Sequence, residues 1–97
     1  MVQRPRGTRD FTPEVMNRRL AFENLLESMA LSHGFKRVQT PIFESLDLFT
    51  AKSGPGVVKQ LYAFQDKSDR ALTLRPELTA PVMRMISEEM RSSPKPL

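Results

Sequence analysis

Apolar side chains recur every three or four residues in the first third of the chain. They fall on one side of a helical wheel, with polar side chains opposite; the apolar set is Val15, Phe22, Leu25, Leu26 and Met29. This period is typical of an amphipathic helix. Thr12 and Pro13 suit the start of a helix, and Gly34 accepts the left-handed conformation that ends many helices. The pattern therefore predicts one long helix between Thr12 and Gly34.

The rest of the chain shows shorter runs with the alternation of strands, which together with the helices indicates an α+β fold. Before the long helix, residues 1–10 have no helical period and indicate an extended arm or an edge strand. After the long helix we expect a strand at 35–40 ended by Pro41, an extended run at 42–43 and a short helix capped by Ser45. A flexible loop at 53–56 then leads to two strands, at 61–65 and 71–74, joined by a polar turn. A second helix capped by Thr79 and a linker-like tail at 92–97 complete the predicted order.

Size and charge narrow the possible functions only slightly. The chain has 97 residues, enough for one small domain that buries about 60 per cent of the surface its unfolded form exposes. Its formal net charge is +4, and the basic residues near the amino end are Arg4, Arg6, Arg9, Arg18 and Arg19. Such an excess suits a nucleic-acid partner, because arginines that neutralise phosphates release counterions. A solvated basic surface is the alternative.

Several kinds of catalytic centre are excluded by what the sequence lacks. With no cysteine and one histidine, His33, the chain has neither a Cys/His pair nor the ligands of a histidine-based metal cluster, so we expect no metal site. Residues 54–56 lack the spacing and the lysine of a phosphate-binding loop. The sequence has no run of apolar residues long enough to span a membrane and no secretory signal, so we expect a cytoplasmic protein with no membrane partner.

One short segment, residues 73–79, concentrates polar chemistry between a strand and a helix. It carries Arg75, Glu77 and Thr79 where a strand end meets a helix start, a common place for ligands. A carboxylate there can hold a substrate ammonium group, and a hydroxyl two residues on can join it. The alternative is an ordinary helix start, with Glu77 favoured by the helix dipole, Thr79 capping and Arg75 in a surface ion pair.

Three runs in this order resemble the start of histidyl-tRNA synthetase: residues 7–11 (Gly-Thr-Arg-Asp-Phe), residues 34–44 with Gly34, Phe35, Val38 and Pro41, and residues 72–77 (Leu-Thr-Leu-Arg-Pro-Glu). The middle run is similar to motif 1 of class II aminoacyl-tRNA synthetases, a long helix and a strand at a dimer interface. The resemblance implies that residues 1–97 are the amino-terminal portion of that antiparallel-sheet catalytic domain, ending before motif 2.

The resemblance also implies roles for particular residues. Glu77 and Thr79 match positions that bind the α-amino group of histidine, and Gly34, Phe35, Val38 and Pro41 match motif 1 at the subunit interface of a homodimer. Arg75 takes no ligand role and is expected in an ion pair. Leu78 departs from the family, where many members have Gly, which implies a less open approach of the backbone to the substrate.

For the parent enzyme the resemblance implies activation of histidine with ATP and Mg²⁺ to an adenylate, followed by transfer to tRNA(His). Because the arginines of motifs 2 and 3 would lie outside these 97 residues, we expect no catalytic residue here and no activity from this piece alone. Two alternatives stay open. One is the regulatory subunit of ATP phosphoribosyltransferase, which resembles the same domain but usually has Asp at the position of Glu77; the other is a free-standing dimerisation or nucleic-acid-binding module.

Overall fold

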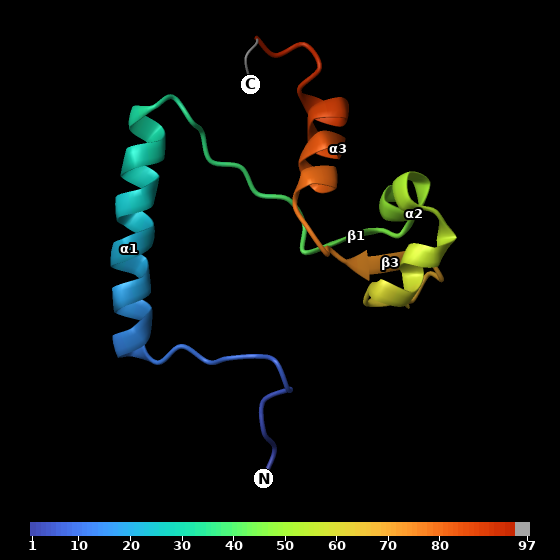
Figure 1. The fold of residues 1–97 in the computed structure, drawn as a ribbon, viewed down its shortest axis with the longest axis horizontal. Coiled ribbons are helices and arrows are strands. Elements are labelled where there is room, and N and C mark those ends of the chain that lie inside the picture. Colours follow the sequence, from blue (N-terminus) through green and yellow to red (C-terminus); the bar gives the residue numbers. More distant parts are fainter. Residues whose placement is uncertain (95–97) are drawn as a thin grey trace. The chain divides into compact units, whose positions relative to one another are not determined.

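The computed structural model describes residues 1–94, and the last three residues of the predicted linker tail lie outside that range. The chain divides into two compact units, Met1–Val38 and Gln39–Leu97. The first holds one long helix, α1 (Pro13–Ser32); the second holds a three-stranded sheet with helices α2 and α3 (Figure 1). Helices and an antiparallel sheet in one short chain agree with the α+β class predicted from the pattern.

The amino-terminal arm of the first unit is extended, with one turn. The Thr8 amide donates to the Pro5 carbonyl at 3.2 Å, and Gly7 adopts a φ of +85°. The Arg4 guanidinium donates to the Thr8 carbonyl at 2.8 Å, which fixes this turn further. Residues 1–10 contain no strand, so of the two alternatives for this segment the extended arm is the one observed.

Helix α1 begins and ends where the local signals place it. Pro13 is its first residue, and its N-cap is Thr12, whose side chain makes no capping hydrogen bond. At the carboxyl end the His33 amide donates to the Ala30 carbonyl, and the His33 ring Nδ1 donates to the Met29 carbonyl at 2.9 Å. Gly34 follows with a φ of +87°, the left-handed conformation that glycine adopts without strain.

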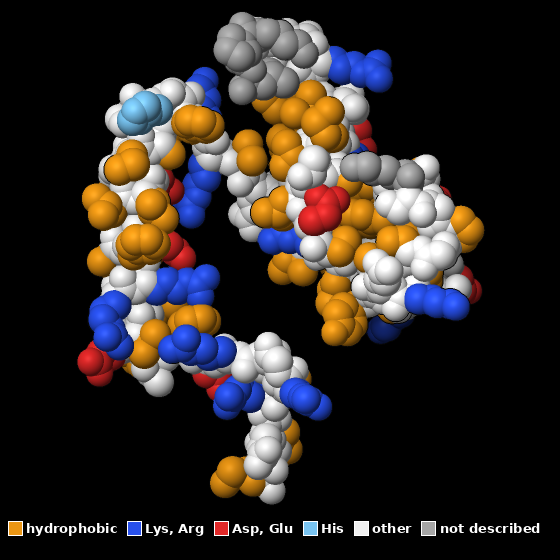
Figure 2. All heavy atoms as spheres, viewed as in Figure 1, with side chains coloured by type: hydrophobic (Ala, Val, Ile, Leu, Met, Phe, Trp, Pro, Cys, Tyr) orange, Lys and Arg blue, Asp and Glu red, His pale blue; other side chains and the backbone are white. Residues whose placement is uncertain are grey.

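The expectation of a single apolar side on α1 needs correction. No residue of this helix is buried, and Phe22, Leu25 and Met29 are exposed by 60, 62 and 58 per cent. Met16, Leu20 and Leu31 lie on other sides of the helical wheel and are also exposed. Figure 2 shows hydrophobic side chains along the length of α1. A helix that is apolar on several sides is typical of an element that other protein surfaces cover.

The strand predicted at 35–40 is not formed. After the Phe35 amide donates to the Ala30 carbonyl, the backbone runs without regular structure to β1 (Phe43–Ser45). The physical reason is that a strand needs a neighbour to accept its hydrogen bonds. Within residues 1–94 the pairing partner of β1 is β3 (Ala71–Leu74), and its register starts only at Phe43 opposite Leu74.

The sheet of the second unit is antiparallel, in the order β1, β3, β2. Strand β2 (Ala63–Gln65) and β3 form the predicted hairpin, although β2 begins two residues later than expected. Glu44 and Ala63 face Thr73 from the two sides of the central strand. Because side chains alternate along a strand, these three share one face of the sheet.

Two short helical segments follow β1, and both differ from the prediction. Helix α2 (Asp47–Ser53) has Leu46 as its N-cap, because Ser45 is still paired in β1. The predicted flexible loop at 53–56 is instead the end of α2, a turn at Gly54 with a φ of +79°, and the start of a 3-10 helix, η1 (Pro55–Gln60). Proline favours the first position of such a helix, which explains the ordered start at this site.

The core of the second unit lies on the sheet face that carries Glu44 and Thr73. Thr73 is fully buried, and Phe49 of α2 and Pro81 of α3 (Thr79–Glu89) are buried as well. The opposite face keeps Phe43 and Phe64 half exposed, with their rings in edge contact at 6.2 Å. The apolar core is therefore small, and polar contacts carry much of the packing.

Asp66 organises the turn of the hairpin. Its Oδ1 accepts hydrogen bonds from the amides of Ser68 and Arg70, both at 2.9 Å, and its Oδ2 accepts one from the Arg70 guanidinium at 2.7 Å. Asp69 takes a φ of +60° in the same turn. The Arg70 amide, more than any other group, lowers the pKa of the Asp66 carboxyl below its ordinary 3.8.

We predict that an NMR titration of the 97-residue chain gives Asp66 a pKa below 3.8. Its carboxylate then stabilises the hairpin above the pKa of the unfolded chain, and this contribution is lost as the pH falls through the lower folded pKa. In the Arg70→Ala variant the pKa rises only part of the way, because the amide of residue 70 still donates. A value at or above 3.8 in the parent chain contradicts this account.

Candidate functional site

The polar segment singled out in the sequence joins the central strand to the last helix. The Arg75 amide donates to the Ile42 carbonyl at 2.9 Å, which extends the pairing of β3 with β1 by one residue. Pro76, Glu77 and Leu78 then lead into α3, whose first residue is Thr79. A strand end and a helix start are thus separated by a few residues, and both ends of the segment are fixed.

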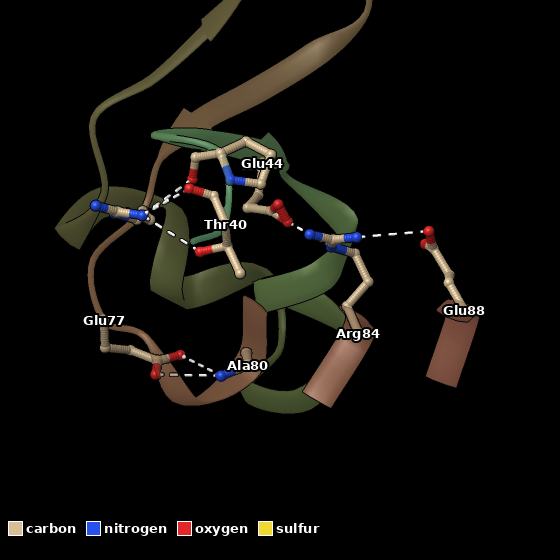
Figure 3. Close-up of polar contacts among 8 residues, drawn as sticks. Thr40, Glu44, Glu77, Ala80, Arg84 and Glu88 are labelled. Atoms are coloured by element: carbon tan, nitrogen blue, oxygen red, sulfur yellow. Dashed lines mark hydrogen bonds and ion pairs between the residues drawn. The ribbon is translucent and has the colours of Figure 1, made fainter. Parts of the chain in front are cut away.

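Glu77 turns its carboxylate toward the start of α3. Its Oε2 accepts a hydrogen bond from the Thr79 amide. Both oxygens also lie within 3.3 Å of the Ala80 amide (Figure 3). The N-cap residue is Leu78, and Thr79 is the first residue within the helix, so the expectation that Thr79 caps α3 is wrong. The longer side chain of Glu77 reaches the free amides that Thr79 was expected to satisfy.

The site keeps capacity for a ligand. A carboxylate has about four acceptor positions, and the two amides of α3 leave part of this capacity free. The side chains of Glu77 and Thr79 are exposed, and the Thr79 hydroxyl makes no hydrogen bond to any described residue. Leu78 has a φ of −109°, which any residue adopts, so glycine is not required there by the backbone.

A hollow of about 260 Å³ lies beside Glu77. Its walls come from α2, η1 and the segment before α3; they comprise Leu48, Phe49, Ser53, Val57, Gln60, Leu61, Pro76, Glu77 and Ala80. The lining is mostly apolar, with one carboxylate. This volume is slightly below the usual range for ligand pockets, about 300 to 1,000 Å³, and fits a small molecule better than a nucleotide.

Arg75 anchors the segment before β1. Its Nη1 donates to the Thr40 carbonyl at 3.0 Å, to the Thr40 hydroxyl at 3.2 Å and to the Pro41 carbonyl at 3.4 Å. The ion pairs found within residues 1–94 do not include Arg75, so the expected ion pair is corrected to a set of bonds to neutral oxygens. These contacts connect Pro41 to a residue two positions before Glu77.

The other residues matched to motif 1 belong to the first unit. Gly34 ends α1, and Phe35 and Val38 follow it with exposures of 69 and 53 per cent. A second hollow, of about 270 Å³, lies between the end of α1 and residues 35–37, lined by Leu26, Glu27, Ala30, Leu31, Phe35, Lys36 and Arg37. Two of these residues, Arg37 and Glu27, form an ion pair of 3.1 Å. The exposed apolar residues here are suited to a protein partner.

A buried ion pair in the second unit escaped the sequence analysis. The Arg84 Nε donates to Glu44 Oε1 at 2.6 Å, and the Glu44 side chain is only 4 per cent exposed. The hydrogen bond with Glu44, more than any other contact, raises the pKa of the Arg84 guanidinium above its ordinary value. The sequence did contain a sign of this pair: Glu44 directly follows the apolar residues Ile42 and Phe43. A charge buried in such a run requires a partner of opposite charge.

In residues 1–94 no three His, Cys, Asp or Glu side chains gather closely enough to hold a metal ion. The helices in the same range include none with the length and apolar character to cross a membrane.

The chain matches the family described as histidyl-tRNA synthetase over residues 7–97. It is 55 per cent identical to the histidine–tRNA ligase of Archaeoglobus fulgidus over 96 residues, and 52 per cent identical to that of Methanospirillum hungatei over 97 residues. These matches cover 99 and 100 per cent of this chain and 24 per cent of each relative. The chain thus spans about a quarter of the length of the curated relatives.

Solved structures give the same result for the fold. The apo histidyl-tRNA synthetase of S. aureus superposes with a TM-score of 0.81 at 40 per cent identity, covering 97 per cent of this chain and 22 per cent of that one. A protein from Bacillus halodurans, described as an ATP phosphoribosyltransferase regulatory subunit/histidyl-tRNA synthetase, gives a TM-score of 0.81 at 26 per cent identity, covering 100 per cent of this chain and 25 per cent of that one.

Fold and sequence together place the chain among the aminoacyl-tRNA synthetases, a class of ligases. Within that class, the chain belongs to the histidyl-tRNA synthetase family.

The contact of Glu77 with α3 can be tested without a ligand. We predict that Glu77→Ala speeds hydrogen exchange at the Thr79 and Ala80 amides, because their acceptor is lost; a missing cap typically costs about 0.5 to 2 kcal/mol. Glu77→Gln, which keeps an acceptor oxygen, changes exchange less. Equal exchange rates in the parent chain, Glu77→Ala and Glu77→Gln contradict the contact between Glu77 and these amides. The control is Glu89→Gln, at the far end of α3.

Proposed function

We propose that this chain is the amino-terminal portion of the class II catalytic domain of a histidine–tRNA ligase, where it holds the amino end of the substrate histidine. The observation that carries this is the carboxylate of Glu77, exposed at the start of α3 beside the free hydroxyl of Thr79, in a chain of this family. An amino acid presents one ammonium group, which a carboxylate and a hydroxyl can bind together.

The energy of such a contact is sufficient to matter for substrate affinity. A hydrogen bond to a charged group contributes about 1.5 to 3 kcal/mol, which is roughly a tenfold to hundredfold change in a dissociation constant. The two amides of α3 fix the carboxylate before the ligand arrives, so little side-chain freedom is lost on binding. The neighbouring hollow, with its apolar walls, would take part of the bound molecule.

In the proposed reaction the histidine carboxylate attacks the α-phosphate of ATP, pyrophosphate leaves, and the histidyl-adenylate then transfers its acyl group to tRNA(His). ATP and Mg²⁺ would be bound by parts of the ligase other than these residues. Positioning and charge neutralisation dominate this chemistry, so the first step needs no general base. The contribution of this chain is orientation: Glu77 and Thr79 hold the ammonium end so that the carboxylate faces the phosphate.

We also propose that the parent enzyme is a homodimer and that α1, with Gly34, Phe35, Val38 and Pro41, forms part of its interface. Apolar side chains on several sides of α1 support this, since exposed apolar patches of this kind mark protein contacts. Arg75 would link the interface residue Pro41 to the segment that carries Glu77.

A second candidate is the regulatory subunit of ATP phosphoribosyltransferase, because the Bacillus halodurans protein with the same fold is described as such a subunit or a histidyl-tRNA synthetase. Aminoacylation separates the two, since only the ligase charges tRNA. A free-standing module is the third candidate, and it predicts no dependence of any activity on Glu77.

The substrate role of Glu77 can be tested in a chimera. The matching segment of the Archaeoglobus fulgidus ligase is replaced by this chain, and histidine-dependent pyrophosphate exchange and tRNA(His) charging are measured. We predict activity from the chimera and, for Glu77→Gln, a KM for histidine raised about tenfold or more with the KM for ATP little changed. The neutral amide keeps an acceptor for α3 but loses the attraction for an ammonium group.

Glu89→Gln, the same chemical change at the end of the same helix, serves as the matched control and should leave both constants unchanged. Unchanged histidine kinetics in Glu77→Gln removes this residue from the substrate site. A chimera that activates histidine but fails to charge tRNA argues for a role other than that of a ligase.

Self-association tests the proposed interface. We predict that the 97-residue chain sediments as a dimer or larger species, and that Leu25→Glu shifts it toward monomer, because a charge at a half-exposed apolar position opposes burial in an interface. Asn24→Glu, one residue away on another side of α1, should leave association unchanged. A monomer at high concentration for the parent chain contradicts the proposal.

A further inference from the structure

Helix α3 has few fully buried apolar side chains, although Val82, Met85 and Ile86 are half-buried. Among the described residues Phe49 is the only large hydrophobic side chain that is buried, and on α3 itself only Pro81 is buried. Met83, on the same helix, is 57 per cent exposed. Apolar packing is non-directional and adapts to small shifts, so a core of this size fixes the position of a helix only loosely.

A polar contact supplies what the apolar core lacks. Glu44 lies on β1 and Arg84 lies in the second turn of α3, and their side chains point toward one another across the space between the sheet and the helix (Figure 3). The Arg84 Nη1 also reaches Glu88 Oε2 at 3.5 Å, one turn further along the helix. A charged hydrogen bond of 2.6 Å at a buried carboxylate depends strongly on geometry and permits little sliding.

The ion pair between Glu44 and Arg84 is linked to Glu77 through the start of α3. Residues 75–78 connect β3 to α3, and each end of this connection is held separately. Arg75 fixes the strand end through Thr40 and Pro41, and Arg84 fixes the helix through Glu44. Because the Glu77 carboxylate is bonded to the first amides of α3, any movement of the helix start moves that carboxylate.

We propose that Glu44 and Arg84 form a positioning pair that sets where α3 begins, and with it the Glu77 carboxylate that receives the amino group of histidine. This inference rests on the proposed function of Glu77. Glu44, at 4 per cent exposure, is too buried to touch a substrate, so it acts through Arg84 and α3 alone. Misplacement of a binding group by about 1 Å can reduce catalytic efficiency about a hundredfold.

The test uses the chimera and measures the KM for histidine, the KM for ATP and kcat. Glu44→Gln should raise the KM for histidine about tenfold with a smaller change in the KM for ATP. Arg84→Lys keeps the charge but loses the directional Nε contact, and should give an intermediate increase. The KM for histidine of the double variant Glu44→Gln/Arg84→Lys should be little higher than that of Glu44→Gln alone, since the pair acts as a unit.

A purely structural role is distinguished by a destabilised control. Asp66→Ala weakens the hairpin turn, which lies at the opposite end of β3 from α3, and should lower thermal stability without raising the KM for histidine. In the 97-residue chain, Glu44→Gln and Arg84→Lys should speed exchange at the Thr79 and Ala80 amides, and Asp66→Ala should not. This exchange readout holds whether or not the chimera is active.

The outcomes separate the two proposals. If Glu77→Gln has no effect on histidine kinetics, the proposed function fails, whatever Glu44 does. If Glu77→Gln raises the KM for histidine but Glu44→Gln and Arg84→Lys leave it within about twofold, or affect it no more than Asp66→Ala, the positioning pair is overturned. If Glu44→Gln does not fold, Arg84→Lys decides by the same criteria.

Discussion

The pairing of β3 with β1 is the constraint on which the placement of α3 depends. Thr73 lies opposite Glu44 on one side and Ala63 on the other, and its own side chain is fully buried. The backbone bond from Arg75 to Ile42 continues this pairing to the point where the chain leaves the sheet. Every later contact, including the placement of α3 and of Glu77, starts from that fixed end, because a short connection transmits the position of the strand to the helix.

The two units differ in how many contacts within the chain stabilise them. In the second unit, polar bonds between β1, β3 and α3 compensate for a small apolar core. In the first, α1 has apolar side chains on several sides and no buried residue within the chain. Tertiary packing normally provides most of the stability of a helix, so the exposed apolar side chains of α1 support the proposal that this helix forms part of an interface.

Local signals in the sequence predicted local structure well. Thr12, Pro13 and Gly34 defined the limits of α1, and the polar residues around Asp66 defined the hairpin turn, because caps and turns depend on a few neighbouring residues. The prediction of a strand at 35–40 was wrong, because alternating side chains in the sequence cannot show whether a neighbouring strand exists. The N-cap assigned to Thr79 was wrong because a glutamate two residues earlier reaches the same amides.

Contacts between distant parts of the chain were beyond such reasoning. Glu44 and Arg84 are 40 residues apart, and Arg75 and Thr40 are 35 apart, so no periodicity connects them. The segment with Glu77 and Thr79 was found from its position between a strand and a helix, and the structure brings both residues to one helix start. Their substrate role remains a prediction, since it came from the family resemblance and concerns a ligand.

The turn at Gly54 has a consequence for how such sites diversify. With a φ of +79°, it separates α2 from η1, and these two elements supply most of the walls of the hollow beside Glu77. The bonds that fix Glu77 come instead from β1, β3 and α3. Insertions or deletions around residue 54 can therefore remodel the cavity walls while the anchor stays in place, because surface connections tolerate changes of length at modest entropic cost. A change of chain length at this turn can in this way alter the shape of the hollow without moving the Glu77 carboxylate.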